Sequence, residues 1–142
     1  MLAYRSAVAA EAKAVLAFWA AAAEDSDRPP DSPEAVLRLI ERDPEALILA
    51  FDNETIVGSI IVGWDGWRCH LYRLAVAPTH RRRGIARTLI TLAESRFTTY
   101  GSTRADAMVL DTNTEAHPTW TTAGYTRQPN WSRWVKPLQT ER

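Results

Sequence analysis

The chain is poor in residues that form disulfides or bind metals, with one cysteine and three histidines among its 142 residues. A single cysteine, Cys69, excludes a disulfide within the chain, so we expect a reducing, cytoplasmic environment. Cys69 lies in strand-like sequence, and we interpret it as a small buried hydrophobic residue. The histidines are scattered and, with Cys69, do not form a set with metal-ligand spacing. We therefore predict no metal site.

The chain also lacks net charge, because 17 Lys and Arg residues balance 17 Asp and Glu residues. Domains that bind nucleic acid are usually basic overall, so we predict no nucleic-acid partner. No uninterrupted apolar run is long enough to span a bilayer. Glu11 and Lys13 interrupt the alanine-rich segment 6–23 where a secretory signal requires an uncharged core. We therefore expect neither membrane association nor secretion.

The composition is that of an ordinary globular protein, with a hydrophobic fraction of 46% and a charged fraction of 24%. A chain of this length fits one domain and can bury a sizeable core. No repeat, linker or low-complexity segment divides it. We therefore predict a single domain over residues 1–142.

Hydrophobic periodicity predicts a mixture of strands and helices. Helices are expected at residues 6–23, 31–42, 84–101 and 113–123. Strands are expected at residues 1–5, 46–51, 56–64, 70–76 and 107–111, and finally at Tyr125 and residues 131–138. Tight turns at residues 52–54 and 64–67 predict an antiparallel meander. The strand at 107–111 should then return parallel to the strand at 70–76 through a right-handed helical crossover.

The segment that organises the chain joins the strand at 70–76 to the helix that follows it. Pro78 ends the strand, because proline has no N–H for a strand ladder. The N-terminus of a helix carries unpaired amides and partial positive charge, so this junction is a candidate phosphate site. Gly84 and Ala86 leave room for close backbone approach. Four cations in this segment suit phosphate oxygens: Arg81, Arg82, Arg83 and Arg87. The alternative is a basic surface turn that caps an ordinary helix.

The order of these signals resembles the GNAT superfamily of acetyl-CoA-dependent N-acetyltransferases, especially its small single-domain bacterial members. The matching features are Val-x-Pro, Arg-x-x-Gly-x-Ala, a helix, a strand, Asn113-x-x-Ala116 and Gly124-Tyr125. The likeness covers nearly the whole chain. It implies an α/β (α+β) fold with a mixed, mostly antiparallel central sheet. That sheet should have about six to seven strands, with about four flanking helices and splayed strands at the cofactor site.

The resemblance also implies how acetyl-CoA, the co-substrate, is bound. The main chain near Ala75 should pair with the pantetheine arm, and amides from Arg82 to Arg87 should hold the pyrophosphate. An amide near Ala75 or Val76 should face the developing oxyanion. Asn113 should bond the cofactor nearby. The implied cofactor-binding residues are Leu74, Ala75, Val76, Arg81, Arg82, Arg83, Gly84, Ile85, Ala86, Arg87 and Asn113.

The sequence departs from the family pattern at Trp120. Many members carry there, seven residues after the motif asparagine, a tyrosine that protonates the departing thiolate. An indole N–H donates a hydrogen bond but delivers no proton at neutral pH. Several alternatives therefore stay open. Coenzyme A leaves as a thiolate or is protonated by water, Tyr125 or Tyr72 serves as the acid, or the protein binds the cofactor and catalyses slowly.

The candidate general base is His70, because lysine acetyltransferases of the superfamily carry a glutamate base at the same distance before the loop. Histidine suits this role near neutral pH; the alternative is a packed or solvent-facing strand residue. Tyr72 shares its strand face and is placed to orient substrate or water. We interpret three further polar residues as surface residues: Asp65, His80 and His117.

Together these features predict transfer of the acetyl group of acetyl-CoA to a primary amine by direct attack in a ternary complex. The second hypothesis is a non-catalytic or weakly catalytic acyl-CoA-binding regulatory module, motivated by Trp120. The sequence does not distinguish a small-molecule amine from a protein amine as the acceptor, nor a monomer from a homodimer.

Overall fold

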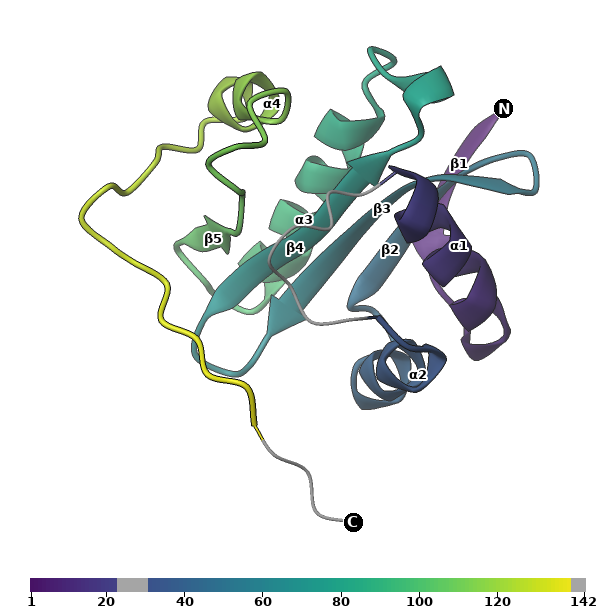
Figure 1. The fold of residues 1–142 in the computed structure, drawn as a ribbon, viewed down its shortest axis with the longest axis horizontal. Helices are drawn as coiled ribbons and strands as arrows, with labels where there is room; N and C mark the ends of the chain where they lie inside the picture. The colour runs from purple at the N-terminus through teal and green to yellow at the C-terminus, as the bar shows by residue number, and fades with distance from the viewer. Residues whose placement is uncertain (23–30, 139–142) are drawn as a thin grey trace.

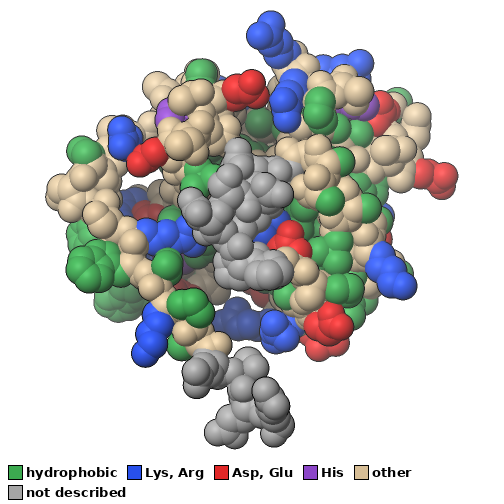
Figure 2. Space-filling view, viewed as in Figure 1, with side chains coloured by type: hydrophobic (Ala, Val, Ile, Leu, Met, Phe, Trp, Pro, Cys, Tyr) green, Lys and Arg blue, Asp and Glu red, His purple; other side chains and the backbone are tan. Residues whose placement is uncertain are grey.

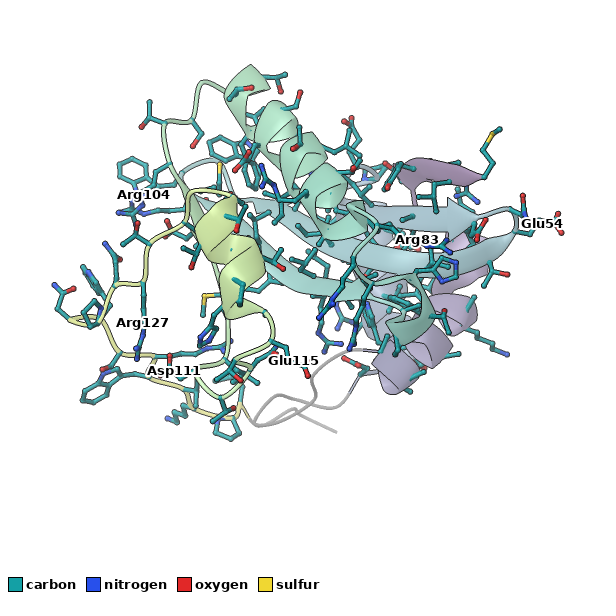
Figure 3. All side chains as sticks on the ribbon, turned by 90° about the horizontal axis from the view of Figure 1, so that it is seen from above. Glu54, Arg83, Arg104, Asp111, Glu115 and Arg127 are labelled. Carbon is teal, nitrogen blue, oxygen red and sulfur yellow. The ribbon has the colours of Figure 1, made fainter. Side chains whose placement is uncertain are left out.

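The computed structural model describes residues 1–22 and 31–138 of the chain. One sheet of five strands, in the order β1-β2-β3-β4-β5, forms its centre (Figure 1). Helices α1 and α2 cover one face of the sheet, and α3 lies across the other (Figures 1 and 3). The strands are β1 (Leu2–Ser6), β2 (Leu47–Asp52), β3 (Thr55–Trp64), β4 (Cys69–Val76) and β5 (Ala105–Ala107). The helices are α1 (Ala12–Ala22), α2 (Pro33–Arg42), α3 (Ile85–Thr99) and α4 (His117–Thr122), with short 3-10 turns at Ala9–Glu11 and Pro78–His80.

The predicted mixed architecture is confirmed, but the described residues form five strands rather than six to seven. β1 to β4 pair antiparallel in chain order, and β5 pairs parallel to β4 after α3. The two predicted hairpin turns are present. Each uses a residue with positive φ, Asn53 at 57° and Gly66 at 92°. Asn and Gly tolerate the left-handed region of φ and ψ, which tight turns between two strands use.

The ends of the first two helices show how local and tertiary signals compete. Ser32 caps α2, since its hydroxyl accepts a hydrogen bond from the Ala35 amide at 3.1 Å, and Pro33 occupies the first turn as predicted. The predicted first helix, in contrast, starts too early at Ser6. Ser6 belongs to β1 and pairs with Ile48 of β2, because an available strand edge satisfies its main-chain groups. Residue 23 lies outside the described residues.

The strands predicted for the C-terminal third are displaced or absent. β5 covers Ala105–Ala107 rather than residues 107–111. The predicted strands at Tyr125 and at residues 131–138 are absent from the described part of the chain. There Trp131 is 72% exposed and Trp134 is 92% exposed, and hydrophobic side chains lie at the surface of this segment (Figure 2). Pro129 and Pro137 cannot donate to a ladder, so the segment carries apolar side chains without the main-chain groups of a regular strand.

Two hydrophobic layers hold the fold together. The layer between the sheet and α3 includes Ile60, Leu89 and Trp120, and the layer between the sheet and the first two helices includes Val15, Trp19 and Leu49. Burying an aliphatic side chain contributes roughly 1.5–3 kcal/mol.

Helix α4 starts at His117 rather than at residue 113, with Pro118 in its first turn, a position that proline tolerates.

Candidate active site

The site begins where β4 and β5 part. The two strands pair only from Cys69 to Leu71, and the last main-chain bond runs from the Met108 amide to the Leu71 carbonyl at 3.1 Å. Beyond Leu71, β4 continues to Val76 with β3 on one edge and no paired strand on the other among the described residues. We call this unpaired side of β4 the open edge. It fits the predicted splaying of the two strands.

A β-bulge in β4 decides which residues face the open edge. Ser59 pairs with Ala75 and Ile61 pairs with Tyr72, so two residues of β4 face one residue of β3. Beyond the bulge, the Ala77 amide donates to the Val57 carbonyl of β3 at 2.8 Å. Because main-chain groups alternate in direction along a strand, Ala75 also turns toward β3, whereas Leu74 and Val76 turn toward the open edge. Of the three β4 residues predicted to pair with the cofactor, the geometry thus favours two.

The start of α3 supplies a set of unused amides beside this edge. Gly84 precedes the helix with φ 80°, a conformation that suits glycine. The first main-chain bond of the helix runs from the Thr88 amide to the Gly84 carbonyl at 3.0 Å. Within the described ranges, no hydrogen bond uses an amide from residues 84–87. Ile85 is only 1% exposed, so the helix start is anchored in the core while its amides remain available.

The four predicted arginines are exposed at this end of α3, with Arg83 labelled in Figure 3. The Arg81 Nη1 atom lies 3.6 Å from the Glu115 Oε2 atom, and the Arg81 Nε atom donates to the Val76 carbonyl at 3.3 Å. Arg87 donates to the Thr122 carbonyl at 3.4 Å. The Glu115 contact brings the segment before α4, which contains Asn113, to residues 81–87, which we call the arginine loop. The structure therefore gathers the predicted cofactor-binding residues at one end of the sheet.

His70 and Tyr72 lie together on the face of β4 toward α1 and α2, with ring centroids 6.0 Å apart. Cys69 and Leu71, which alternate with them, pack toward α3. The His70 Nε2 atom is 3.9 Å from the Asp65 Oδ2 atom. The His70 side chain is 29% exposed, so acceptor and water can reach it. Burial raises the pKa of Tyr72.

Asp65 is a candidate site residue that the sequence interpretation missed. Its Oδ1 atom accepts from the amides of Arg68 at 2.7 Å and Trp67 at 2.8 Å. These two bonds, Arg68 first, lower the pKa of Asp65 and fix the carboxylate toward His70. The signal in the sequence was an Asp-Gly turn directly before the strand that carries the histidine.

Trp120 and Tyr125 occupy the opposite face of the sheet from His70. Trp120 is 7% exposed and packs edge to face on Tyr125 in the layer under α3. The Tyr125 hydroxyl donates to Glu94 of α3 at 2.8 Å. Burial, and then this hydrogen bond, raise the pKa of Tyr125. The four predicted catalytic residues are thus divided between two faces.

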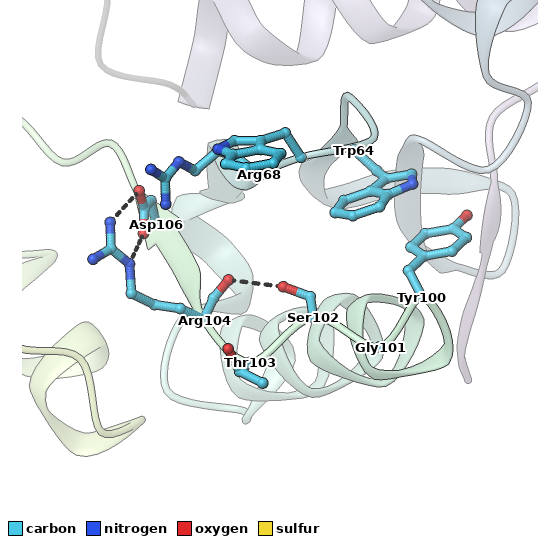
Figure 4. Close-up of a pocket in the computed structure, with 9 residues that line it drawn as sticks. Trp64, Arg68, Tyr100, Gly101, Ser102, Thr103, Arg104 and Asp106 are labelled. Carbon is cyan, nitrogen blue, oxygen red and sulfur yellow. Dashed lines mark hydrogen bonds and ion pairs between the residues drawn. The ribbon is translucent and has the colours of Figure 1, made fainter.

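A separate pocket of about 240 Å3 lies at the other end of α3 (Figure 4). Trp64 and Tyr100 stack in its wall with centroids 5.1 Å apart, and Arg104 forms two bonds to Asp106 at 2.7 and 2.9 Å. The pocket is formed by Trp64, Trp67, Arg68, residues 100–104 and Asp106. α3 has 15 residues and is therefore about 22 Å long, so this pocket is remote from the arginine loop at the start of the helix.

Neither a metal centre nor a bilayer-spanning helix is found in the described ranges. No group of three or more His, Cys, Asp or Glu residues there is arranged to hold a metal ion. None of the helices in those ranges has the length and apolar character needed to cross a bilayer.

The fold is that of the N-acetyltransferases. The structure aligns with the PaiA N-acetyltransferase of Thermoplasma acidophilum, solved in complex with coenzyme A, at a TM-score of 0.76 and 17% identity, covering 90% of this chain and 91% of that one. It also aligns with the diaminobutyrate acetyltransferase EctA of Paenibacillus lautus at a TM-score of 0.73 and 20% identity. This alignment covers 86% of this chain and 74% of that one.

The sequence comparisons identify the family. The model of the Acetyltransferase (GNAT) family matches residues 14–125, and the chain therefore belongs to that family. An acetyltransferase of Yersinia pestis (strain Pestoides F) is 39% identical over 87 residues, which span 61% of this chain and 62% of that protein. An acetyltransferase of Pectobacterium atrosepticum is 36% identical over 102 residues, 71% of each chain. The match thus covers a little over three fifths of the Yersinia protein.

Proposed function

We propose that the protein is an acetyl-CoA-dependent N-acetyltransferase that transfers the acetyl group to a primary amine by direct attack in a ternary complex. The observation that carries this proposal is the set of unused amides at residues 84–87 beside the open edge of β4. Amides at a helix start bind phosphate oxygens, and an unpaired strand edge binds an amide-containing chain such as pantetheine. Family membership and the fold support the same activity.

The coenzyme would lie across these two elements. The pyrophosphate would accept hydrogen bonds from the amides between Gly84 and Arg87. Arg82 and Arg83, which are exposed, would add positive charge. The pantetheine arm would pair with Leu74 and Val76 at the open edge, and Asn113 would contact it nearby. The thioester would then lie close to the point where β4 and β5 separate.

The chemistry assigned to this geometry has three parts. His70, with the Asp65 carboxylate 3.9 Å from its Nε2 atom, accepts a proton from the ammonium group of the acceptor. The resulting amine attacks the thioester carbonyl, and a main-chain amide at the open edge stabilises the oxyanion. The carbon–sulfur bond then breaks, and the nitrogen releases its second proton to water, which leaves a neutral amide. We infer that coenzyme A leaves as a thiolate that water protonates, because Trp120 cannot give up a proton at neutral pH and Tyr125 already donates to Glu94.

The charges beside His70 favour a cationic acceptor. Asp65 lies on one side, and Asp106 is opposite His70 in the pairing of β4 with β5. The bond from Arg104 keeps the pKa of Asp106 low, with a smaller contribution from His70. The Asp65 carboxylate raises the local concentration of ammonium groups, whereas Arg104 balances the charge of Asp106. This supports a primary amine as the acceptor.

Titration of acetyl-CoA by calorimetry tests the proposal. We expect saturable binding by the wild type and a loss of roughly 100-fold, about 2.8 kcal/mol, in Gly84→Glu, which places a carboxylate among the phosphate-binding amides. Gly101→Glu is the matched control, because Gly101 has φ 77° at the other end of the same helix and equally open surroundings. Absence of binding by the wild type would remove the acyl-CoA hypothesis.

The second candidate, an acyl-CoA-binding regulatory module, is favoured by the position of Trp120 and by the engaged hydroxyl of Tyr125. Release of free thiol with a panel of amines, peptides and aminoglycosides separates the two functions. An enzyme releases coenzyme A with at least one acceptor above the rate without acceptor. A binding module titrates with acetyl-CoA and stays silent with every acceptor.

A further inference from the structure

Ser59 of β3 is the one polar residue among the fully buried residues of the described chain, with 0% exposure. Its hydroxyl connects α1 to β4. The Trp19 indole N–H donates to the Ser59 Oγ atom at 2.9 Å, and this Oγ atom donates to the Arg73 carbonyl at 2.8 Å. A satisfied polar group inside a core specifies one arrangement of the chain, because every alternative leaves a buried donor or acceptor unpaired.

Arg73 is the strained residue of the β4 bulge. Its φ is 52°, in a region that residues other than glycine rarely occupy. The surrounding contacts hold it there at both ends. The carbonyl accepts the Ser59 hydroxyl, while the guanidinium lies 4.6 Å above the Trp19 ring and donates to Asp31 at 2.9 Å. Trp19 thus holds the bulge through Ser59 and through direct contact with the arginine.

The bulge determines which amides reach the open edge. Leu71 turns its carbonyl toward β5, so uninterrupted alternation would place Arg73 and Ala75 at the open edge. With the bulge, Leu74 and Val76 take those places. Side chains follow the same shift: Leu74 and Val76 pack toward α3, whereas Ala75 packs toward α1. A shift of one residue would therefore present different amides to the thioester.

We propose that Trp19, Ser59 and Arg73 are positioning residues for acetyl transfer, because they lock the bulge that presents the Leu74 and Val76 amides to the coenzyme. The inference rests on the proposed function. It assigns to these three residues no contact with the reacting atoms. Their effect passes through the register of β4.

Two variants weaken this network: Trp19→Phe removes one of its hydrogen bonds, and Ser59→Ala removes both. We expect kcat to fall 10- to 100-fold in both, since a small displacement of a catalytic donor costs about that much. The dissociation constant for coenzyme A should rise by a smaller factor than kcat falls, because the amides at residues 84–87, which would hold the pyrophosphate, are untouched. Val62→Ala is the matched control: Val62 is fully buried on the α3 side of the same strand, so this variant loosens the core without touching the network.

Glycine at position 73 supplies a rescue. Gly adopts positive φ without strain. The double variant Ser59→Ala/Arg73→Gly should therefore have a kcat at least threefold higher than that of Ser59→Ala. A purely structural role of Ser59 predicts no recovery, because Arg73→Gly also removes the contacts to Trp19 and Asp31. Unchanged kcat in folded Trp19→Phe and Ser59→Ala, or a decrease shared by Val62→Ala, would overturn the inference.

Amide hydrogen exchange keeps this test separate from that of the proposed function. In the wild type, we expect slow exchange at Ala75 and Ala77 and fast exchange at Leu74 and Val76 in the absence of ligand. In Ser59→Ala, the exchange rates of these four amides should become more similar. Wild type that is silent in the acceptor screen removes the proposed function. An exchange pattern that is the same in Ser59→Ala and wild type removes the inference about the bulge.

Discussion

Trp120 and Tyr125 meet edge to face under α3, with ring centroids 5.0 Å apart and ring planes at 76°. We infer that neither side chain of this pair protonates the leaving thiolate. Trp120 has no acidic proton at neutral pH, and the Tyr125 hydroxyl is bonded to Glu94 with a raised pKa. The geometry thus assigns this pair to packing.

Replacement of Tyr125 by phenylalanine tests that assignment. We expect kcat to stay within about threefold of wild type. The free energy of unfolding should fall by about 1–3 kcal/mol, because the half-buried Glu94 carboxylate loses its donor. Steady-state kinetics and urea unfolding measure the two effects. A loss of kcat by about 100-fold without loss of stability would instead make Tyr125 the acid. Tyr72→Phe is the comparison on the other face of β4.

His70→Ala should lower kcat/KM at neutral pH by about 100-fold or more, because the ammonium group of the acceptor loses its base. Activity of the variant should recover as pH rises, since the free amine then supplies the nucleophile directly. Asp65→Asn should cost less, roughly 3- to 10-fold, because it removes only the negative charge 3.9 Å from the ring. The check is a rate profile over about pH 6 to 9. Full activity of His70→Ala over that range would show that His70 is not the base.

Gly58 lets the start of α3 approach the sheet. A Cβ atom at this position would lie 2.9 Å from the Ile85 Cγ2 atom and 3.1 Å from the Ala50 Cβ atom. Gly58→Ala should therefore destabilise the protein by about 1–3 kcal/mol and, by moving Ile85, weaken acetyl-CoA binding. Gly63→Ala is the control on the same strand, where the nearest atom would be 3.5 Å away. Equal unfolding energies for the two variants, measured in urea, would show that this close approach is unimportant.

Asp52 links the β2–β3 turn to the arginine loop. Its Oδ2 atom lies 2.8 Å from the Nε2 atom of His80, whose side chain is 17% exposed, so the interpretation of His80 as a surface residue is wrong. The bond from His80 lowers the pKa of Asp52. A lowered carboxyl pKa stabilises the fold above the ordinary value near 3.9, and this contribution is lost as pH falls through the lower folded value.

Asp52→Asn should therefore lower the melting temperature at neutral pH, and the difference from wild type should shrink below about pH 4. Thermal unfolding of both proteins across this pH range measures the effect. A difference that stays constant with pH would mean that the loss comes from the shape of the turn rather than from the charge.

Much of the site was predictable because its signals lie close together in the chain. Pro78, the arginines and Gly84 mark the end of a strand and the start of a helix within seven residues, and Ser32 with Pro33 marks the start of α2. Such signals act through the main chain of neighbouring residues, so the sequence records them directly. The helix-start amides follow from the same pattern.

The family resemblance, the order of most elements and the cationic loop before α3 were predictable from the sequence alone. The fold was needed to show that His70 and Tyr125 lie on two faces, that Asp65 lies beside His70, that β4 bulges at Arg73 and that β5 ends at Ala107. Each of these depends on which edge or face of the sheet a distant segment meets. Pairing across a sheet is chosen by packing between residues far apart in the chain, and no local periodicity encodes that choice.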